Sequence, residues 1–504
     1  MPGDCQGHSS SGEGAIIDRS AFAGSSQPVD RPRGTYDRLP DEWEALRRLE
    51  DRLTALVQRH GYRRLETPVV EHAELFARKL GGERLAQTYQ FNFRGRDLAL
   101  RPEHTASVMR VYVDGLQSAA LPIRLSYGGP VFRYESPQAG RSRQFIEFGC
   151  ELIGADGLLA DAETILVALA CVEAAGVEQP RLVLGHIGVV LGFLDQLALD
   201  HRTQDWLIWS MERIRRGEPD ATRIPPHLVP SESEEAGAFA LDTLDRAAVV
   251  DLLRQSGVEF EAGTRTAEEI VDGLFDKGRR SAEREVLADA IVFVEALVAS
   301  AGPPATALPR LRELVQSKEL DMTPVDELAQ ITDILAASGM NSDNIQIDLG
   351  LGRGLRYYTG MLFEIYGGDA DGLQIAGGGR YDDLARQLGA RSQVQSAGFS
   401  IGLERLLLAG VHPASAVEVR RVLVLAGASP AATFQLAAEL RALGWTAVID
   451  TRARSENSAR RWAGRNGYDA TVTQGEGEVL FYRCVDGREI VADGPLGPEE
   501  VVAA

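Results

Sequence analysis

Arginine and glutamate side chains that could bind anionic or cationic groups are concentrated in four segments lying far apart in the chain. Guanidinium groups stay protonated and bind phosphate or carboxylate oxygens through a planar fork of N–H donors. Each segment alone also has an ordinary structural interpretation: Arg133 could pair with a nearby carboxylate, residues 377–379 could be only a tight turn, and Tyr357 could pack against Tyr358. The segments are residues 100–105, 129–151, 352–358 and 377–405.

Two glutamates stand in an apolar context that makes them candidates for a site. Glu147 and Glu151 fall within the run QFIEFGCELI, which spans residues 144–153 and predicts a strand. Because side chains alternate along a strand, both carboxylates are expected on one face, and Arg133 and Glu135 on one face of the preceding strand. A carboxylate among apolar neighbours is costly unless it is paired, so both glutamates are either paired or functional.

The elements that must position these residues can be read from the spacing of apolar side chains. Residues 61–71 predict a helix stop followed by a strand. Periodic helical segments dominate residues 185–335, and a small α/β pattern begins near residue 421. Residues 1–30 are rich in Ser, Gly and Gln and predict a disordered tail. Further strands are predicted at 97–101, 123–134, 345–349 and 361–366, and helices at 43–57, 160–176 and 398–408.

Composition places the chain among ordinary globular proteins. It has 504 residues, 44% hydrophobic and 25% charged, and a formal charge of −20, which argues against nonspecific coating of DNA. The four cysteines form no CxxC or Cys/His pattern, so no zinc site or disulfide framework is predicted. No signal sequence and no apolar run of about 20 residues is found, which predicts a soluble, cytoplasmic protein with no membrane partner.

Seven motifs in order resemble those of histidyl-tRNA synthetases, a family of class II aminoacyl-tRNA ligases. The resemblance covers residues 31–184 and 336–410. The motifs are RGTYDRLP, GYRRLETPVVE, LRPEHTASVMR, GPVFRYESPQAGRSRQFIEFGCELIG, GRGLRYYTG, AGGGRYDDL and GFSIGLERLL.

The resemblance implies an α+β fold, in which a mostly antiparallel sheet is flanked by helices. The catalytic core would comprise residues 31–184, with motifs 1 and 2, and 336–412, with the histidine motifs and motif 3. Residues 185–335 would be a helical insertion, and residues 418–504 a degenerate α/β domain of the anticodon-binding kind. That last domain carries one basic cluster, around Arg454 and Arg460, which could be a solvated helix face or an RNA contact.

The resemblance also implies substrates and residue roles. ATP, accompanied by Mg²⁺, L-histidine and tRNA(His) would be the partners, with no metal held by the protein itself. Arg133 and Arg353 would act at the α-phosphate and Arg133 also on the substrate carboxylate. The histidine-binding residues would be Glu103, His104, Thr105, Arg133, Glu147, Glu151, Arg353, Tyr357 and Tyr358, and the ATP-binding residues Arg133, Glu135, Arg141 and Arg405.

Within that set, Glu103 and Thr105 match the residues that receive the substrate ammonium. Glu151 and Tyr358 match those that read the imidazole, which offers one donor and one acceptor.

Several positions depart from the family pattern and keep a second function open. Glu147 stands where glutamine is usual, Ile146 where histidine is usual, Arg356 where aspartate is common and His104 where glycine is frequent. The alternative is a non-catalytic paralogue, the histidine-sensing regulatory subunit of ATP phosphoribosyltransferase, whose partner would be that enzyme's catalytic subunit. Retention of Arg133, Arg353 and Arg405, together with a C-terminal domain, favours the ligase.

The segment 61–71 also bears on assembly. In class II enzymes a proline-bearing segment of this kind forms a twofold interface, and Pro68 lies between apolar Leu65 and Val69. A homodimer is therefore predicted, although a buried core strand would give the same pattern.

Overall fold

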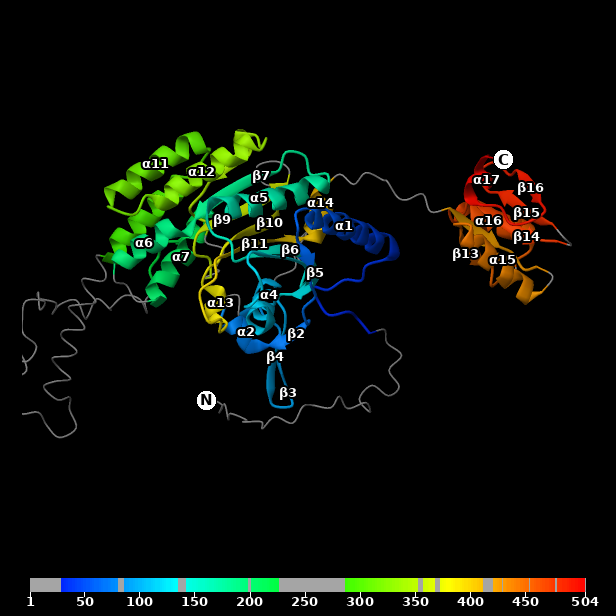
Figure 1. The fold of residues 1–504 in the computed structure, drawn as a ribbon, viewed down its shortest axis with the longest axis horizontal. Helices are drawn as coiled ribbons and strands as arrows, with labels where there is room; N and C mark the ends of the chain where they lie inside the picture. The colour runs from blue at the N-terminus through cyan, green and yellow to red at the C-terminus, as the bar shows by residue number, and fades with distance from the viewer. Residues whose placement is uncertain are drawn as a thin grey trace, which may run out of the picture. The chain divides into compact units, whose positions relative to one another are not determined.

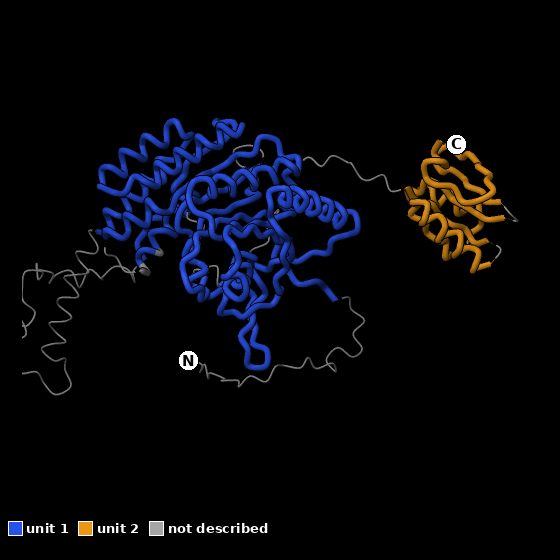
Figure 2. Tube along the Cα trace, viewed as in Figure 1, with its two compact units in different colours: residues 1–412 blue, residues 413–504 orange. Residues whose placement is uncertain are grey.

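A computed structural model gives the architecture of the chain, which divides into two compact units, Met1–His412 and Pro413–Ala504 (Figure 2). Each unit is described by itself. The structure describes residues 29–79, 86–134, 142–197, 201–225, 286–351, 357–367, 372–410, 420–427, 429–452, 454–475 and 478–503.

The first unit is built on an eight-stranded sheet whose order is β1-β5-β6-β11-β10-β9-β7-β8. Each of the six inner strands is antiparallel to its neighbours among those six, and only the edge pairs β1–β5 and β7–β8 are parallel. This confirms the predicted α+β class with a mostly antiparallel sheet. The strands are β1 Arg63–Arg64, β5 Ile123–Phe132, β6 Gln144–Ile153, β7 Arg181–His186, β8 Ile345–Ile347, β9 Met361–Gly367, β10 Leu373–Arg380 and β11 Ser396–Gly402.

Helices cover the sheet and enclose one continuous apolar core (Figure 1). Helix α5 (Gly157–Ala174) packs across β6, β9, β10 and β11, and α1 (Pro40–Arg59) packs against α5 and α14 (Leu403–Ala409). The run 160–176 is apolar on nearly all sides because α5 lies between the sheet and α12 (Thr323–Ala337).

Within residues 185–335, the regular secondary structure of the described residues beyond β7 is helical, as the periodicity predicted, and residues 226–285 lie outside the described part. Besides α12 they comprise α6 (Ile187–Gln196), α7 (His201–Arg215), a helix at residues 286–299 and α11 (Pro304–Ser317).

A small three-stranded sheet, β2-β4-β3, carries the loop that leads to the site. Its strands are β2 (Val70–His72), β3 (Gln90–Phe93) and β4 (Arg96–Leu100), all antiparallel. Helix α2 (Ala73–Ala77) follows β2, and α4 (Thr105–Val111) follows β4. Helix α4 therefore begins directly after residues 101–104, and α2 packs against both β4 and α4.

One prediction about local structure was wrong, and one alternative that the sequence left open does not occur. The helix expected over 398–408 begins only at Leu403, because residues 396–402 form the central strand β11. Glycines 377–379 lie inside strand β10 rather than in a turn. In both cases glycine is required by close approach: a Cβ on Gly378 would lie 2.2 Å from the carbonyl oxygen of Gly398 on the next strand.

The second unit is a five-stranded sheet, β13-β12-β14-β15-β16, with two cores of its own. Strands β12, β13 and β14 are parallel, as the predicted alternation of strand and helix requires. The elements are β12 Arg421–Val424, α15 Pro430–Ala442, β13 Thr446–Ile449, α16 Glu456–Arg465, β14 Ala470–Gln474, β15 Val479–Arg483, β16 Glu489–Ala492 and α17 Pro498–Ala503.

Candidate active site

Glu151 lies at the centre of the sheet, on β6, and is 1% exposed. The Tyr127 hydroxyl on β5 donates to Oε1 at 3.1 Å, and the Tyr381 hydroxyl beyond β10 donates to Oε2. Burial raises the pKa of this carboxyl to about 7, even though hydrogen bonds from Tyr381 and Thr105 oppose the shift. Gly398 faces it across the sheet, and a Cβ there would lie 1.7 Å from Oε2. The glycine on β11 therefore makes the room in which the carboxylate lies.

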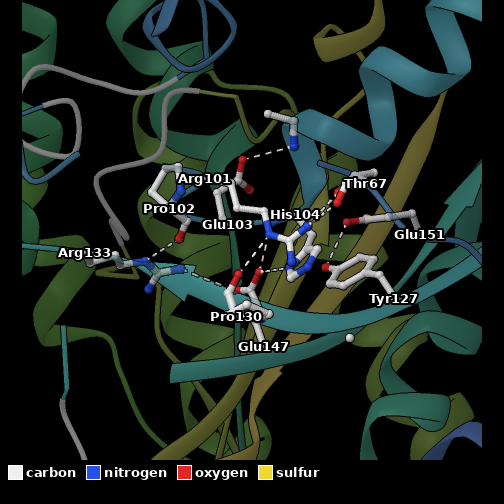
Figure 3. Close-up of polar contacts among 12 residues, drawn as sticks. Thr67, Arg101, Pro102, Glu103, His104, Tyr127, Pro130, Arg133, Glu147 and Glu151 are labelled. Atoms are coloured by element: carbon white, nitrogen blue, oxygen red, sulfur yellow. Dashed lines mark hydrogen bonds and ion pairs between the residues drawn. The ribbon is translucent and has the colours of Figure 1, made fainter. Parts of the chain in front are cut away.

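Glu147 lies four residues earlier on the same face of β6 and is also buried (Figure 3). Its Oε2 accepts hydrogen bonds from the backbone N–H of His104 at 3.0 Å and from His104 Nδ1 at 3.1 Å. Its Oε1 accepts from Arg133 Nη2 at 3.2 Å. Burial by itself would raise the pKa of Glu147, but the His104 hydrogen bonds and the Arg133 charge outweigh it and bring the pKa to about 2. Glu147 is therefore an anion that is already fully partnered.

His104 acts on Glu147 and does not face solvent. Its side chain is fully buried and its ring stacks on Tyr127 with centroids 4.5 Å apart. Burial lowers the pKa of His104 despite the neighbouring carboxylate, so the ring is neutral at pH 7 and donates through Nδ1. Its Nε2 is buried with no hydrogen-bond partner among the described residues.

Glu103 and Thr105 stand at the start of helix α4, which places them over the face of the sheet that carries Glu151. Glu103 Oε1 accepts from the backbone N–H of Ala106 at 3.0 Å, and Oε2 forms an ion pair with Lys79. Thr105 is buried, and its hydroxyl hydrogen-bonds to Glu151. The 100–105 segment and the 144–151 segment, far apart in sequence, therefore meet at one carboxylate.

Arg133 follows the last residue of β5 and is fixed by two contacts. Its Nε donates to the carbonyl of Pro102 at 2.8 Å, while Nη2 is bound to Glu147. The guanidinium also lies 5.0 Å from the centroid of the Phe145 ring. Its Nη1 makes no hydrogen bond to any described residue, which leaves one donor edge for a ligand oxygen.

Arg405 lies on α14, which directly follows β11. Its Nη1 donates to the carbonyl of Gln374 at 3.1 Å. Strands β5 and β11 both pair antiparallel with β6, so they run in the same direction. Their C-terminal ends therefore lie along the same edge of the sheet, the one formed by strand ends. Gly402 and Gly129 are both opposite Glu147 in register, which places the elements carrying Arg133 and Arg405 at one edge.

Glu404 joins three parts of this edge. Its carboxylate accepts the backbone N–H of Ile146 at 2.9 and 3.1 Å and pairs with Arg38, which lies in the RGTYDRLP motif. Ile146 therefore contributes its main chain at this position, where its side chain departs from the family pattern.

Tyr357 and Tyr358 are both buried, with ring centroids 4.4 Å apart. The Tyr357 ring also lies 5.8 Å from that of Tyr381. A Cβ on Gly379 would lie 2.9 Å from Cε1 of Tyr358, so the glycine strand also makes room for this ring. The two rings therefore pack against each other and beside Tyr381, whose hydroxyl binds Glu151.

The structure thus gathers Glu103, His104, Thr105, Arg133, Glu147, Glu151, Tyr357 and Tyr358 around one face of the sheet. Glu135, Arg141, Arg353 and Arg356 lie outside the described residues. Sequence reasoning missed Lys79, Tyr127 and Tyr381. Two signals in the sequence could have pointed to them. Tyr127 and Glu151 fall on neighbouring strands of the predicted pair, and Lys79 is one of only three lysines in the chain.

The described residues contain no group of three or more His, Cys, Asp or Glu side chains that could hold a metal ion. Among those same residues, no helix is both long and apolar enough to cross a bilayer.

The sheet order, its antiparallel interior and the arginines at one edge define a class II aminoacyl-tRNA synthetase fold, and the crystal structure of apo S. aureus histidyl-tRNA synthetase shares it. That structure matches with a TM-score of 0.59 at 22% identity, covering 94% of this chain and 99% of its own. The chain belongs to the histidyl-tRNA synthetase family, whose model matches residues 34–218 and 229–406.

Two relatives show how the family divides. The chain is 33% identical to the histidine–tRNA ligase of Archaeoglobus fulgidus over 456 residues, covering 90% of this chain and 93% of the relative. It is 35% identical to the ATP phosphoribosyltransferase regulatory subunit of Moorella thermoacetica over 447 residues, covering 88% and 97%.

Proposed function

We propose that the protein is a histidine–tRNA ligase that activates L-histidine with ATP and transfers it to tRNA(His). The observation that carries the proposal is that Glu151, a buried carboxylate between two tyrosine hydroxyls, lies on the same sheet face as Arg133. A hydrogen-bonding carboxylate suits an imidazole N–H, and the open edge of the guanidinium suits a carboxylate or phosphate oxygen.

In the first step a carboxylate oxygen of histidine attacks the α-phosphorus of ATP, and the bond to the pyrophosphate oxygen breaks. Arg133 is held by Pro102 and Glu147, so its remaining donors are oriented before the substrates bind. Donors fixed in advance stabilise developing charge without reorganisation. Arg405 at the same edge would bind the ATP tail. In the second step a hydroxyl of the tRNA attacks the acyl carbon and AMP leaves.

Mg²⁺ is proposed to arrive with ATP. It binds through one or two carboxylates and substrate phosphates rather than in an all-protein cage. The ion would neutralise phosphate charge, while this chain's arginines position the nucleotide. The free thiols Cys150, Cys171 and Cys484 suit the cytoplasm as its compartment.

A histidine-sensing regulatory subunit of ATP phosphoribosyltransferase is the second candidate, and two observations favour it. Glu103, the expected partner of the substrate ammonium, is already paired with Lys79. In the second unit, part of the basic cluster is neutralised: Arg454 pairs with Asp450, and Arg460 pairs with Glu456 and Glu489. Paired cations offer less to an RNA phosphate.

The deciding experiment is histidine-dependent exchange of labelled pyrophosphate into ATP, catalysed by the full chain with Mg²⁺. The ligase gives exchange in the wild type, and Arg353→Ala loses roughly 10²-fold or more of the rate, as expected for one electrostatic group at the transition state. Arg353→Lys recovers part of it, since a point charge does not reproduce the guanidinium fork. The exposed helix-end variant Arg59→Ala removes the same charge elsewhere and should leave the rate unchanged.

If folded wild-type protein binds histidine yet gives no exchange at saturating ATP, the ligase proposal is wrong. Stimulation of an ATP phosphoribosyltransferase catalytic subunit would then establish the second candidate.

A further inference from the structure

Lys79 places a protein ammonium group inside the candidate site. It follows α2, its side chain is 0% exposed, and its Nζ is paired with Glu103 Oε2. The same nitrogen lies 4.1 Å from the centroid of the Tyr357 ring. Its charge also acts on Glu151: burial raises the pKa of that carboxyl, and Lys79 opposes the rise. One cation thus contacts or influences three residues expected to bind L-histidine.

A buried lysine is costly unless a carboxylate neutralises it, and a cation over an aromatic face gains further attraction. Glu103 and Tyr357 supply both contacts, so the ammonium is stably held. These are also the interactions that the α-ammonium of an amino acid would seek in this pocket.

Among the described residues, the other two carboxylates of the pocket also bind protein donors through both of their oxygens. Both oxygens of Glu147 are taken, by His104 and by Arg133. Both oxygens of Glu151 receive tyrosine hydroxyls. A ligand ammonium that pairs with Glu103 must therefore compete there with Lys79.

We propose that Lys79 competes with the ligand's α-ammonium for Glu103, and so determines how strongly the pocket distinguishes an α-amino acid from the same acid without its amino group. The inference rests on the proposed binding of histidine at this site, and it holds for a ligase and for a sensor alike. In the wild type, binding exchanges one ammonium for another at Glu103, so the ligand's amino group adds little affinity. Without Lys79, the ligand's ammonium neutralises a buried carboxylate.

The test is a double-mutant cycle between the protein's ammonium and the ligand's. Calorimetry measures L-histidine and 3-(imidazol-4-yl)propionate, which lacks the amino group, binding to the wild type and to Lys79→Met. Close charge pairs in desolvated sites couple strongly enough to change affinity at least about tenfold. In the wild type the two ligands should bind within about threefold of each other. In Lys79→Met, L-histidine should bind about tenfold tighter than in the wild type, and at least tenfold tighter than the analogue.

Two further variants guard against misfolding and general charge effects. Glu103→Gln keeps Lys79 but removes the shared anion, so both ligands should again bind alike even if Lys79→Met does not fold. Lys318→Met removes the same charge from an exposed position after α11 and should change neither affinity.

The outcomes separate the inference from the function beneath it. If Lys79→Met weakens L-histidine, or leaves the ratio between the two ligands unchanged, Lys79 does not compete with the ligand and the inference is wrong. If Lys79→Met does not fold and Glu103→Gln still favours L-histidine tenfold, it is equally wrong. If no variant binds either ligand, the proposed histidine site itself fails. If only Lys79→Met binds L-histidine, the competition is stronger than stated and the inference stands.

Discussion

Replacing Glu151 by glutamine tests the centre of the proposed site, because this substitution keeps the shape of the side chain and removes its charge. The two oxygens of Glu151 accept from Tyr127 and Tyr381, and both tyrosine hydroxyls can rotate to accept from an amide instead. The fold should therefore persist. What is lost is the charged acceptor for the imidazole N–H of histidine.

The expected loss in histidine affinity follows from the burial of this carboxylate. A hydrogen bond to a charged group contributes about 1.5–3 kcal/mol, against about 1 kcal/mol for a neutral one. Because the amide can still accept a hydrogen bond, the loss of binding free energy should be on the order of 1–3 kcal/mol, which corresponds to a dissociation constant roughly 5- to 150-fold larger.

The same variant should change how stability depends on pH. The folded pKa of Glu151 is about 7, above the 4.5 of an unperturbed glutamate. Between these values the folded protein keeps a proton that the unfolded chain releases, so the free energy of unfolding falls as pH rises through this window. The fall from this one group is on the order of 3 kcal/mol. Glu151→Gln has no such proton and should lose that part of the pH dependence.

Calorimetric titration with L-histidine and urea unfolding at pH 5 and pH 8 measure the two effects. Glu50→Gln is the matched control, since Glu50 is a buried glutamate on α1 paired with Arg64 and touches no residue of the site. Unchanged histidine affinity in folded Glu151→Gln would remove Glu151 from the site. An unchanged difference in stability between pH 5 and pH 8 would refute the reasoning about its pKa.

Two other predictions concern stability and assembly. Arg380 donates to Asp161 at 2.9 and 2.6 Å in the buried interior, so Arg380→Met should lower the free energy of unfolding by about 3–5 kcal/mol, and adding Asp161→Leu should recover most of the loss in urea unfolding. For assembly, light scattering should give a mass twice the 54.6 kDa of one chain. Val70→Asp, at an exposed apolar position after Pro68, should shift the measured mass toward that of the monomer, whereas Val485→Asp, at another exposed position, should not. A stable wild-type monomer at micromolar concentration would contradict the dimer.

The sheet could be predicted from the sequence where apolar alternation and length agreed. Strand β6 has the bounds 144–153 that its composition predicted, and β5 differs from the predicted 123–134 by two residues at one end. Strand β11 was missed because residues 398–402 join an apolar run that continues into α14, and only tertiary packing separates them. The glycine opposite Glu151 is explained by a contact across the sheet, which no local pattern contains.

The segment 61–71 illustrates the same limit. Arg63–Arg64 forms strand β1, which pairs parallel with β5 at the edge of the large sheet, whereas Val70 and Glu71 begin β2 of the small sheet. Val70 is 43% exposed. The segment is therefore not a single buried core strand, which was the alternative that the sequence left open. The dimer remains a prediction.

Two of the positions that depart from the family pattern, His104 and Glu147, are hydrogen-bonded to each other, and this bears on how the added charge is accommodated. Glu147 adds a buried charge where glutamine is usual, and such a charge is costly without partners. His104, another departure, supplies two of its hydrogen bonds, and Arg133 supplies the third. Both oxygens of the added carboxylate therefore have matching donors. The departures at positions 104 and 147 therefore compensate each other, and they leave the choice between ligase and sensor to the arginines at the edge of the site.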